Sequence, residues 1–386
     1  MQNPTFKEVQ RRLRFNECCK KYFDDKSCSF FDVFDILAER INIMMDESFP
    51  CALFTKNNLR PSKYEEFKIQ VETSLSILKN SYTYVASGQR YKALEIIYNH
   101  YFSEGIESIL EEIPSETPLY RMRSSDYYPI YEDEEMFHVP FEKNFLLSNQ
   151  RYSISGFPSL YCASSVYCCW LEMGRPHFEK ANIALYKIQN VKSRELFHMN
   201  TESKDEVIVK CINVDMEESE NIVNSQNVKW LLLFSICDLR VKETEHPFVP
   251  EYVIPQLLLE CVVRYIHENN INYILGVKYK SVKRNDERLE FFGKQNSNLF
   301  YNYVFPPYKY TNKGTCEILK RIFKLQANTS WFYLNNVAPS VAPNVLKPNR
   351  TYDLSSFRKI ETYLSEPQIL IDFKKNGRPI QKNIHS

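Results

Sequence analysis

The spacing of apolar residues changes near residues 113–118, and this change constrains the fold of the chain more than any other feature. Before it, apolar side chains recur every three or four residues in the ranges 29–46, 63–80 and 90–112, a period that predicts amphipathic helices. After it, apolar runs of strand length alternate with polar stretches. Two prolines and small polar residues in 113–118 indicate a linker between the two parts.

The first part, residues 1–112, is expected to be a small helical bundle. The second part begins at residue 115. Its apolar runs predict strands at 119–122, 160–163, 184–187, 207–212, 231–237 and 273–279, with one helix at 255–269. Few helices among many short strands are typical of a mixed domain. We therefore expect an α+β protein in which an N-terminal helical bundle precedes a mixed α/β domain over residues 115–310.

The last stretch, residues 325–386, is expected to be a C-terminal extension with no chemistry of its own. Three prolines between 339 and 348 argue against a long regular element there, and 368–373 has the pattern of a late strand. The first part also lacks a catalytic motif. None of the seven histidines has an arginine on the same helical stripe at the R-x₄₋₆-H spacing that one class of helical ribonuclease carries. We expect residues 1–112 to serve regulation or oligomerisation.

Composition argues against several classes of function. With 8 glycines in 386 residues the chain has neither G-x-G-x-x-G nor G-x-x-x-x-G-K-[ST], so dinucleotide-fold and P-loop sites lose their support. A net charge of +1 argues against a protein that holds nucleic acid through its phosphates. The eleven cysteines lack the C-x-x-C spacing of zinc sites and are expected to be reduced thiols. Without a secretory signal or an apolar run of about 20 residues, the chain is expected to be cytoplasmic, with no membrane segment.

One cluster of charged and aromatic residues suggests a binding site. Between positions 119 and 172 the chain carries Arg121, Arg123, Arg151, Tyr152, Tyr161 and Glu172, the last between apolar neighbours. A carboxylate in an apolar setting needs a partner or a function. Arginines bind phosphate through paired donors and tyrosines offer stacking surfaces, so this set suits an anionic, aromatic substrate. Solvated charges beside a core strand are the alternative explanation.

The order of these residues closely resembles the RES family, toxin-like domains named for an Arg, a Glu and a Ser. Residues 151–164 read RYSISGFPSLYCAS and residues 170–172 read WLE, close to the family core R-[FY]-[ST]-x-x-G-x-P-x-L-Y-x-A and the Glu that follows it. Other blocks agree: LYR at 119–121, FVPEYVIPQ at 248–256, GVKYKS at 276–281 and NLF at 298–300, where the family has its final strand. The resemblance covers residues 115–310. It departs from the family at Ile154 and Ser155, where relatives often have prolines.

This resemblance implies an NAD⁺-consuming fold akin to the ADP-ribosyltransferases, with NAD⁺ as substrate and with no resident cofactor or metal. Carried over by position, the catalytic residues would be Glu172, Arg121 and Ser281, and the NAD⁺-binding residues Arg151 and Tyr161, with Tyr152 and Arg123 as further candidates. Glu172 is expected to stabilise positive charge on the ribose as nicotinamide leaves. The two leading arginines, Arg121 and Arg151, are expected to bind the pyrophosphate. Tyr161 would stack on the nicotinamide, and Ser281 would bond its amide or a ribose hydroxyl.

Three functions stay open on the sequence. The first is cleavage of NAD⁺ by water or inorganic phosphate, as a toxin or an effector of defence against phage, with a cognate antitoxin or regulatory protein as partner. The second is transfer of ADP-ribose to a protein or nucleic acid. The third is a degenerate module that binds NAD⁺ without cleaving it, although all five leading positions carry the family's residue types. The helices of 1–112 are expected to form homo-oligomer contacts or to sense a trigger.

Overall fold

A computed structural model gives the fold of the chain. It describes residues 4–46, 61–125, 131–193, 196, 206–215, 223–242, 246–269, 271–283, 298–332, 334 and 352–365. The main helices are α1 (Phe6–Leu13), α2 (Phe15–Cys18), α3 (Lys20–Asp24), α4 (Phe30–Met45), α5 (Pro61–Ala86), α6 (Arg90–Tyr101), α7 (Val166–Glu172), α9 (Val228–Cys237), α10 (Val253–Asn269), α12 (Glu317–Ile322) and α14 (Ser356–Ser365). The strands are β1 (Leu110–Glu112), β2 (Leu119–Ser124), β3 (Leu160–Ala163), β4 (Ala181–Ile188), β5 (Val209–Asn213), β6 (Ile274–Lys280), β7 (Tyr301–Phe305) and β8 (Phe323–Ser330).

The strands form one mixed sheet in the order β1-β5-β6-β7-β3-β2-β4-β8. Neighbouring strands β5 and β6 are parallel, and the other neighbours are antiparallel. Between β2 and β3 a single residue pair, Tyr120 with Ala163, joins the strands. The sheet is therefore weakly held together at this point, close to its middle.

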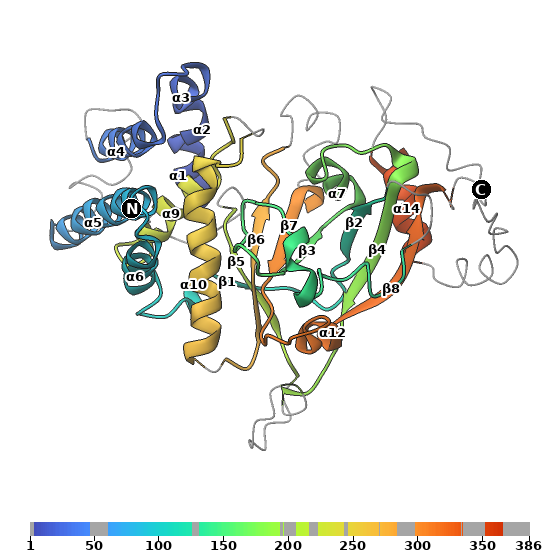
Figure 1. Ribbon diagram of the computed structural model, residues 1–386. Coiled ribbons are helices and arrows are strands. Elements are labelled where there is room, and N and C mark those ends of the chain that lie inside the picture. Colours follow the sequence, from blue (N-terminus) through green and yellow to red (C-terminus); the bar gives the residue numbers. More distant parts are fainter. Residues whose placement is uncertain are drawn as a thin grey trace, which may run out of the picture.

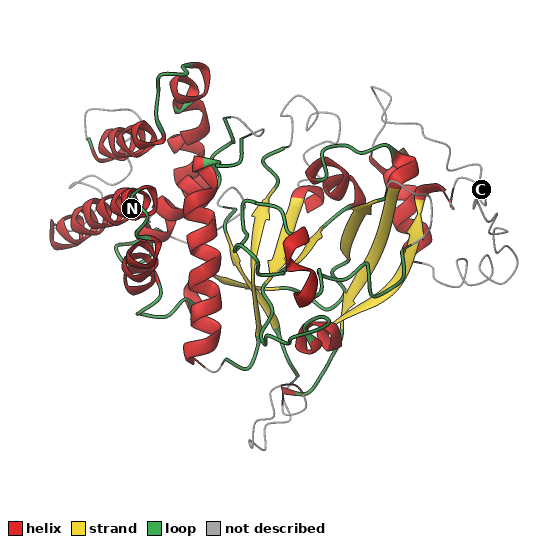
Figure 2. Cartoon of the chain, viewed as in Figure 1, coloured by secondary structure: helices red, strands yellow, loops and turns green. Residues whose placement is uncertain are grey.

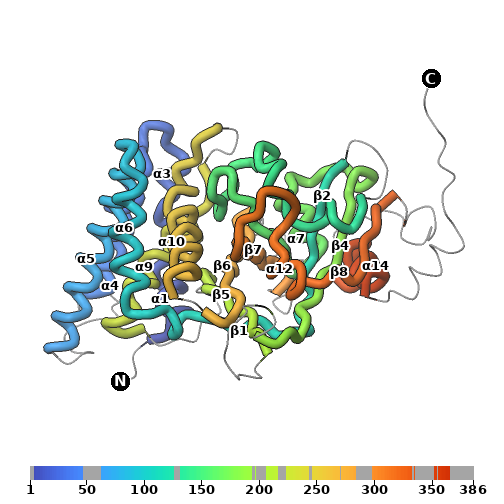
Figure 3. Tube along the Cα trace, turned by 60° about the horizontal axis from the view of Figure 1, so that its bottom comes forward, coloured from blue at the N-terminus to red at the C-terminus, as the bar shows by residue number. Residues whose placement is uncertain are grey.

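The N-terminal helices pack directly on the sheet domain. Figure 1 shows α1–α6, α9 and α10 together on one side of the molecule, while α7, α12 and α14 lie over the rest of the sheet, and Figure 2 shows the same division by element type. Seen from below, α4, α5 and α6 lie beside α9 and α10 (Figure 3). One hydrophobic core cluster runs from Leu37 of α4 through Ile97 of α6 and Leu258 of α10 to Val277 of β6. The helical part and the sheet are thus joined by a shared apolar core.

The expected α+β class is confirmed. The helices predicted at 29–46, 63–80 and 255–269 correspond to α4, α5 and α10, and α5 extends further in both directions. Strand predictions at 119–122, 160–163, 184–187, 207–212 and 273–279 correspond to β2 to β6. In the described part of the chain, no helix is both long and apolar enough to span a membrane.

The helix predicted over 90–112 is wrong in its second half. Helix α6 ends at Tyr101, and Gly105 follows with φ +86°, a left-handed conformation that stops a helix. Beyond it, β1 pairs with β5 as an edge strand, Leu110 opposite Ile212. Ile106 and Leu110 have the spacing of a helical stripe, but Ile106 is buried in the shared core and Leu110, partly buried, packs against that core from β1. The sheet therefore begins before the boundary expected at residue 112.

The strand predicted at 231–237 is wrong, because this run lies within helix α9. Every residue of α9 is buried, so the run has no polar face that would reveal a period of 3.6 residues. Its one charged side chain is Lys229, whose Nζ donates to the carbonyl of His100 over 2.9 Å and to Glu104 over 3.1 Å.

Two expectations for the end of the chain also need correction. Strand β8 runs across residue 325 and pairs with β4 from Asn182 to Ile188, so the sheet extends into the expected C-terminal extension. The strand expected at 298–300 begins instead at Tyr301. Both the strand predicted at 368–373 and the three prolines between 339 and 348 lie outside the described residues.

Candidate active site

Glu172 is the last residue of α7, a short helix whose other six residues are buried. Ser165 caps its beginning, because its Oγ accepts a hydrogen bond from the N–H of Cys168. The helix stops after Glu172 because Gly174 and Arg175 both adopt left-handed backbone angles, φ +78° and +59°. A carboxylate at the C-terminal end of a helix faces the negative end of the helix dipole and needs donors from elsewhere. Its side chain is 29% exposed, so a ligand can reach it.

Two side chains supply those donors, one directly after β6 and one on the neighbouring strand β7. Ser281 Oγ donates to Glu172 Oε1 over 2.5 Å, and Asn302 Nδ2 donates to the same oxygen over 2.9 Å. The orientation of the Asn302 amide is set in turn, because its Oδ1 accepts a hydrogen bond from Cys168 Sγ at 3.4 Å. Asn302 is 5% exposed and Ser281 is 1% exposed. The carboxylate is thus held in one orientation by buried groups.

Close packing of β6 against β7 brings those donors together. Tyr279 lies opposite Asn302 in the strand register, and the N–H of Ser281 donates to the carbonyl of Phe300 over 2.8 Å. Gly276 on β6 makes the approach possible: a Cβ there would lie 2.5 Å from Phe305 Cδ1 and 2.8 Å from the carbonyl oxygen of Val304. Any other residue at this position would push β7 away from β6.

A lysine completes the surroundings of the carboxylate. Lys283 Nζ donates to the backbone carbonyl of Glu172 over 2.7 Å and lies 3.9 Å from Glu172 Oε2. Its side chain is 39% exposed, so it stands at the open side of the site. One carboxylate oxygen is therefore occupied by Ser281 and Asn302, while the other faces solvent beside a cation.

Four tyrosines form the wall next to Glu172. Burial and then the charge of Glu172 raise the pKa of Tyr279 well above its usual value. Burial also raises the pKa of Tyr252; the Arg151 charge lowers it and the Glu172 charge raises it. The ring of Tyr279 packs against that of Tyr152 in a tilted arrangement, with 4.4 Å between the ring centroids, and Tyr152 is fully buried. Tyr161 is half-buried, and its hydroxyl donates to the carbonyl of Tyr152 over 2.6 Å.

Arg151 lies near this wall, but its guanidinium donates hydrogen bonds to backbone carbonyls. Its Nη1 donates to the carbonyl of Cys237 over 2.8 Å, and its Nη2 to that of Leu239 over 2.9 Å. These carbonyls end helix α9, where a cation is favourable. The guanidinium also lies over the ring of Tyr252, 5.4 Å from its centroid, and Arg151 is 6% exposed. Its contacts in the structure are those of a buried residue that fixes the end of a helix.

Arg121 and Arg123 lie on the other face of the sheet. They alternate along β2 with Tyr120 and Met122, which belong to the core cluster beneath α7, so their side chains leave the opposite face. Nη1 of Arg121 donates to the backbone carbonyl of Tyr161 over 2.9 Å, across the weak junction of β2 and β3. Arg123 bonds the carbonyl of Glu135. The structure therefore brings Glu172, Ser281, Tyr161, Tyr152 and Arg151 to one region and leaves the two β2 arginines outside it.

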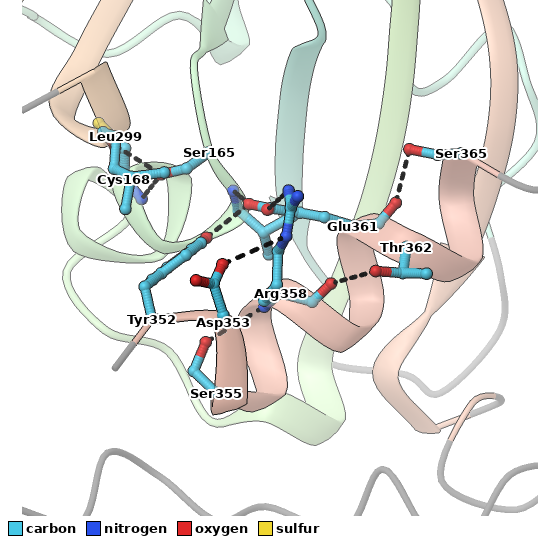
Figure 4. A network of polar contacts seen from close by, with 11 residues as sticks. Ser165, Cys168, Leu299, Tyr352, Asp353, Ser355, Arg358, Glu361, Thr362 and Ser365 are labelled. Carbon is cyan, nitrogen blue, oxygen red and sulfur yellow. Dashed lines mark hydrogen bonds and ion pairs between the residues drawn. The ribbon is translucent and has the colours of Figure 1, made fainter. Parts of the chain in front are cut away.

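The C-terminal helix α14 holds the beginning of α7 (Figure 4). Glu361 is 2% exposed, and its Oε1 accepts hydrogen bonds from the N–H of Val166 over 2.9 Å and from the Tyr352 hydroxyl over 2.5 Å. Arg358 Nη1 donates to Oε2 over 3.3 Å. Burial raises the pKa of Glu361, and these three donors partly offset that rise. The segment expected to be a passive extension thus anchors the helix that carries Glu172.

Sequence reasoning missed three residues that shape the site: Asn302, Lys283 and Glu361. Asn302 lies within an apolar strand, and a polar residue at such a position is a signal of a special role. The strand pattern alone does not say what that role is. Lys283 lies two positions after Ser281 in a polar stretch, a pattern that is typical of a solvated loop. Glu361 had no readable signal, because its partner Val166 is 195 positions away.

The described residues contain no group of three or more His, Cys, Asp or Glu side chains that could hold a metal ion. The two histidines with the largest pKa shifts are structural. Burial lowers the pKa of both His100 and His138 to about 4. His138 is fully buried, with Nδ1 bonded to the carbonyl of Val139 and Nε2 accepting the N–H of Cys316, both over 2.8 Å.

Comparison with known proteins gives one informative match. No family model matches the chain, and no solved structure matches it significantly. The chain is 28% identical over 320 residues to a protein of Bacillus subtilis (strain 168) named "Putative toxin YopC". The match covers 78% of this chain and 69% of that protein. The similarity therefore covers more residues than the 115–310 range contains, and part of it lies outside that range.

Proposed function

We propose that this protein is a toxin that acts by cleaving the nicotinamide–ribose bond of NAD⁺. The toxin role is supported by the similarity to a protein named as a toxin. The chemistry is supported by the resemblance of residues 151–172 to the RES core. The single observation that carries the proposal is the carboxylate of Glu172, partly exposed and held through one oxygen by Ser281 and Asn302.

In the proposed reaction the bond between the ribose C1′ and the nicotinamide nitrogen breaks, and both electrons leave with nicotinamide. The ribose gains positive charge, as in glycoside hydrolysis. The Glu172 carboxylate stabilises that charge. Because Ser281 and Asn302 already fix the carboxylate, little reorganisation is needed as the charge develops. A water molecule then forms the new C1′–O bond, and its proton passes to Glu172 Oε2 and on to solvent. The products are nicotinamide and ADP-ribose.

The aromatic wall supports an aromatic leaving group. Tyr252 and Tyr279 both lie close enough to Glu172 for its charge to affect their pKa values. Tyrosine rings beside a carboxylate provide a stacking surface for a flat cationic ring such as the nicotinamide of NAD⁺. Tyr152, which is fully buried, supports this wall from behind and makes no contact with the substrate.

Expression of the full chain in bacteria tests the toxin role together with its chemistry. We expect growth to stop and cellular NAD⁺ to fall after induction. The Glu172→Gln variant keeps an oxygen acceptor for both donors, and should therefore fold but leave growth and NAD⁺ unchanged. Growth arrest by both proteins at equal expression would contradict the proposal. Arrest by the parent alone with constant NAD⁺, and with ADP-ribose on a macromolecule, would instead support ADP-ribosyl transfer.

A further inference from the structure

A cavity of about 620 Å³ lies where α1 and α2 meet the end of α9 and the turn after β6. Its charged lining residues are Lys7, Arg11, Arg14, Arg240, Glu17 and Asp238. Four cations and two carboxylates give it a net charge of +2, twice that of the whole chain. A cavity of this size fits a small-molecule ligand, and its charge favours an anionic one.

The floor of this basic cavity is fixed from two sides. Asn16 of α2 donates through Nδ2 to the carbonyl of Asp238 over 3.2 Å, and its Oδ1 accepts the N–H of Arg240 over 3.0 Å. From the other side, Arg151 holds the carbonyls of Cys237 and Leu239. Segment 237–240 is therefore clamped between an N-terminal helix and the RES-like core, and a rigid lining lowers the entropic cost of binding.

The lining offers partners for a phosphate ligand that also carries hydroxyl groups. Arg14 adopts a left-handed backbone, φ 44° and ψ 43°, at the junction of α1 and α2. This conformation ends α1, where the N–H of Arg14 donates to the carbonyl of Gln10 over 3.1 Å, and the side chain of Arg14 lines the cavity. Gln10 Oε1, also in the lining, is buried without a hydrogen-bond partner among the described residues. A ligand hydroxyl would satisfy that acceptor, while guanidinium groups bind phosphate through paired donors.

The residues that follow β6 connect the cavity to Glu172. Val282 lines it, and the residues on either side of Val282 both contact Glu172: Ser281 bonds its Oε1, and Lys283 bonds its backbone carbonyl. In Figure 1 the end of β6 lies between α1 and α2 on one side and α7 on the other. A substrate cleaved at Glu172 can therefore extend past the end of β6 toward the basic wall.

We propose that the N-terminal helices complete the substrate site, and that the basic cavity binds the diphosphate of the dinucleotide whose ribose lies at Glu172. This inference rests on the proposed function. It assigns the diphosphate to Arg11 and Arg14, with Lys7 and Arg240 adding positive charge. The arginines expected from the sequence to do this, Arg121 and Arg151, are instead bonded to backbone carbonyls.

Calorimetric titration with ADP, which has the diphosphate but no scissile nicotinamide bond, tests this assignment on the full chain. We expect the double variant Arg11→Gln, Arg14→Gln to bind ADP at least about tenfold more weakly, since guanidinium groups bind phosphate through paired donors. The matched control is Arg12→Gln on the same helix, which is exposed and outside the cavity lining, and it should bind as the parent does. If the double variant has a lower melting temperature, Lys7→Gln replaces it. NAD⁺ should compete with ADP.

The outcomes separate this inference from the proposed function. Equal ADP affinity in the double variant and in Arg12→Gln, no ADP binding by the parent, or ADP binding that NAD⁺ does not displace would each overturn the cavity assignment. Cleavage of NAD⁺ with an unchanged KM in the double variant would overturn it while leaving the proposed function intact. ADP binding that depends on Arg11 and Arg14, in a protein that leaves NAD⁺ uncleaved, would keep the cavity and remove the proposed function.

Discussion

Ser281 Oγ donates a 2.5 Å hydrogen bond to Oε1 of Glu172, although the two residues lie 109 positions apart in the sequence. Ser281 follows strand β6 and Glu172 ends helix α7, so the hydrogen bond joins the ends of these two elements. Asn302 on β7 donates to the same oxygen. The carboxylate is therefore oriented by the sheet before any substrate arrives, and this arrangement suits a group that must stabilise charge as it develops.

Replacing Asn302 with leucine removes one of the two donors while keeping the branching of the side chain. We expect kcat for NAD⁺ cleavage to fall about 10- to 100-fold, as is usual when a group that orients a catalytic residue is lost. KM should stay nearly constant, because Asn302 is buried and acts through Glu172. Steady-state kinetics separate the two parameters. An unchanged kcat in a folded variant would show that Asn302 has no positioning role.

Arg151 is expected to contribute to stability more than to substrate affinity. Its two hydrogen bonds hold carbonyls at the end of α9, and Arg151→Ala leaves those carbonyls without their charged donor. We expect the free energy of unfolding to fall by about 3 kcal/mol, measured by urea denaturation. The exposed Arg12→Ala should change it by less than about 0.5 kcal/mol. A stable Arg151→Ala variant with a raised KM for NAD⁺ would favour direct binding of the substrate instead.

Glu361 is expected to affect activity although it is remote from Glu172 along the chain. Its removal in Glu361→Ala leaves the N–H of Val166 and the hydroxyl of Tyr352 without their acceptor, which loosens the first turn of α7. We expect lower kcat together with faster amide hydrogen exchange in residues 166–172. Thr362→Ala, at the exposed neighbouring position on α14, is the matched control. Normal exchange in α7 of the Glu361 variant would exclude this anchoring role.

Stability is expected to fall as the solution becomes acidic. The pKa of His138 is lowered by burial from 6.5 to about 4, so between these values the unfolded chain binds a proton that the folded chain does not. The free energy of unfolding therefore decreases as pH falls from 6.5 towards 4, by roughly 3 kcal/mol at most for this residue. His100 acts in the same direction. Urea denaturation between pH 4.5 and 7 should show a shallower slope for His138→Gln, and an equal slope would contradict the assignment.

Much of the fold could be predicted from the sequence, because in α4, α5, α10 and most strands the buried residues recur at the period of a helix or a strand. Helix α9 shows no such period, because all its residues are buried. Helix α1 lies within the part expected to be helical, and it also has a local signal: Thr5 and Glu8 form a capping box, and Phe6, Val9 and Leu13 are buried at helical spacing.

The candidate site was predictable only in part, for reasons of register and distance. The motif in residues 151–172 indicated Glu172, and the block at 276–281 indicated Ser281. The structure places these two residues in contact. The faces on which Arg121 and Arg123 emerge depend on the alternation of β2 within the sheet, which a motif does not specify. Asn302 reaches Glu172 because β6, β7 and α7 converge, and such convergence leaves no local pattern.

The central claim is tested most directly by chromatography of the products after the purified full chain is incubated with NAD⁺, with and without inorganic phosphate. We expect the parent to release free nicotinamide with ADP-ribose, or with a phosphorylated ADP-ribose where phosphate is the acceptor. The Glu172→Gln variant, folded to the same melting temperature, should release about 100-fold less or none. Intact NAD⁺ after incubation with the parent, or equal nicotinamide release by both proteins, would contradict the role given to Glu172.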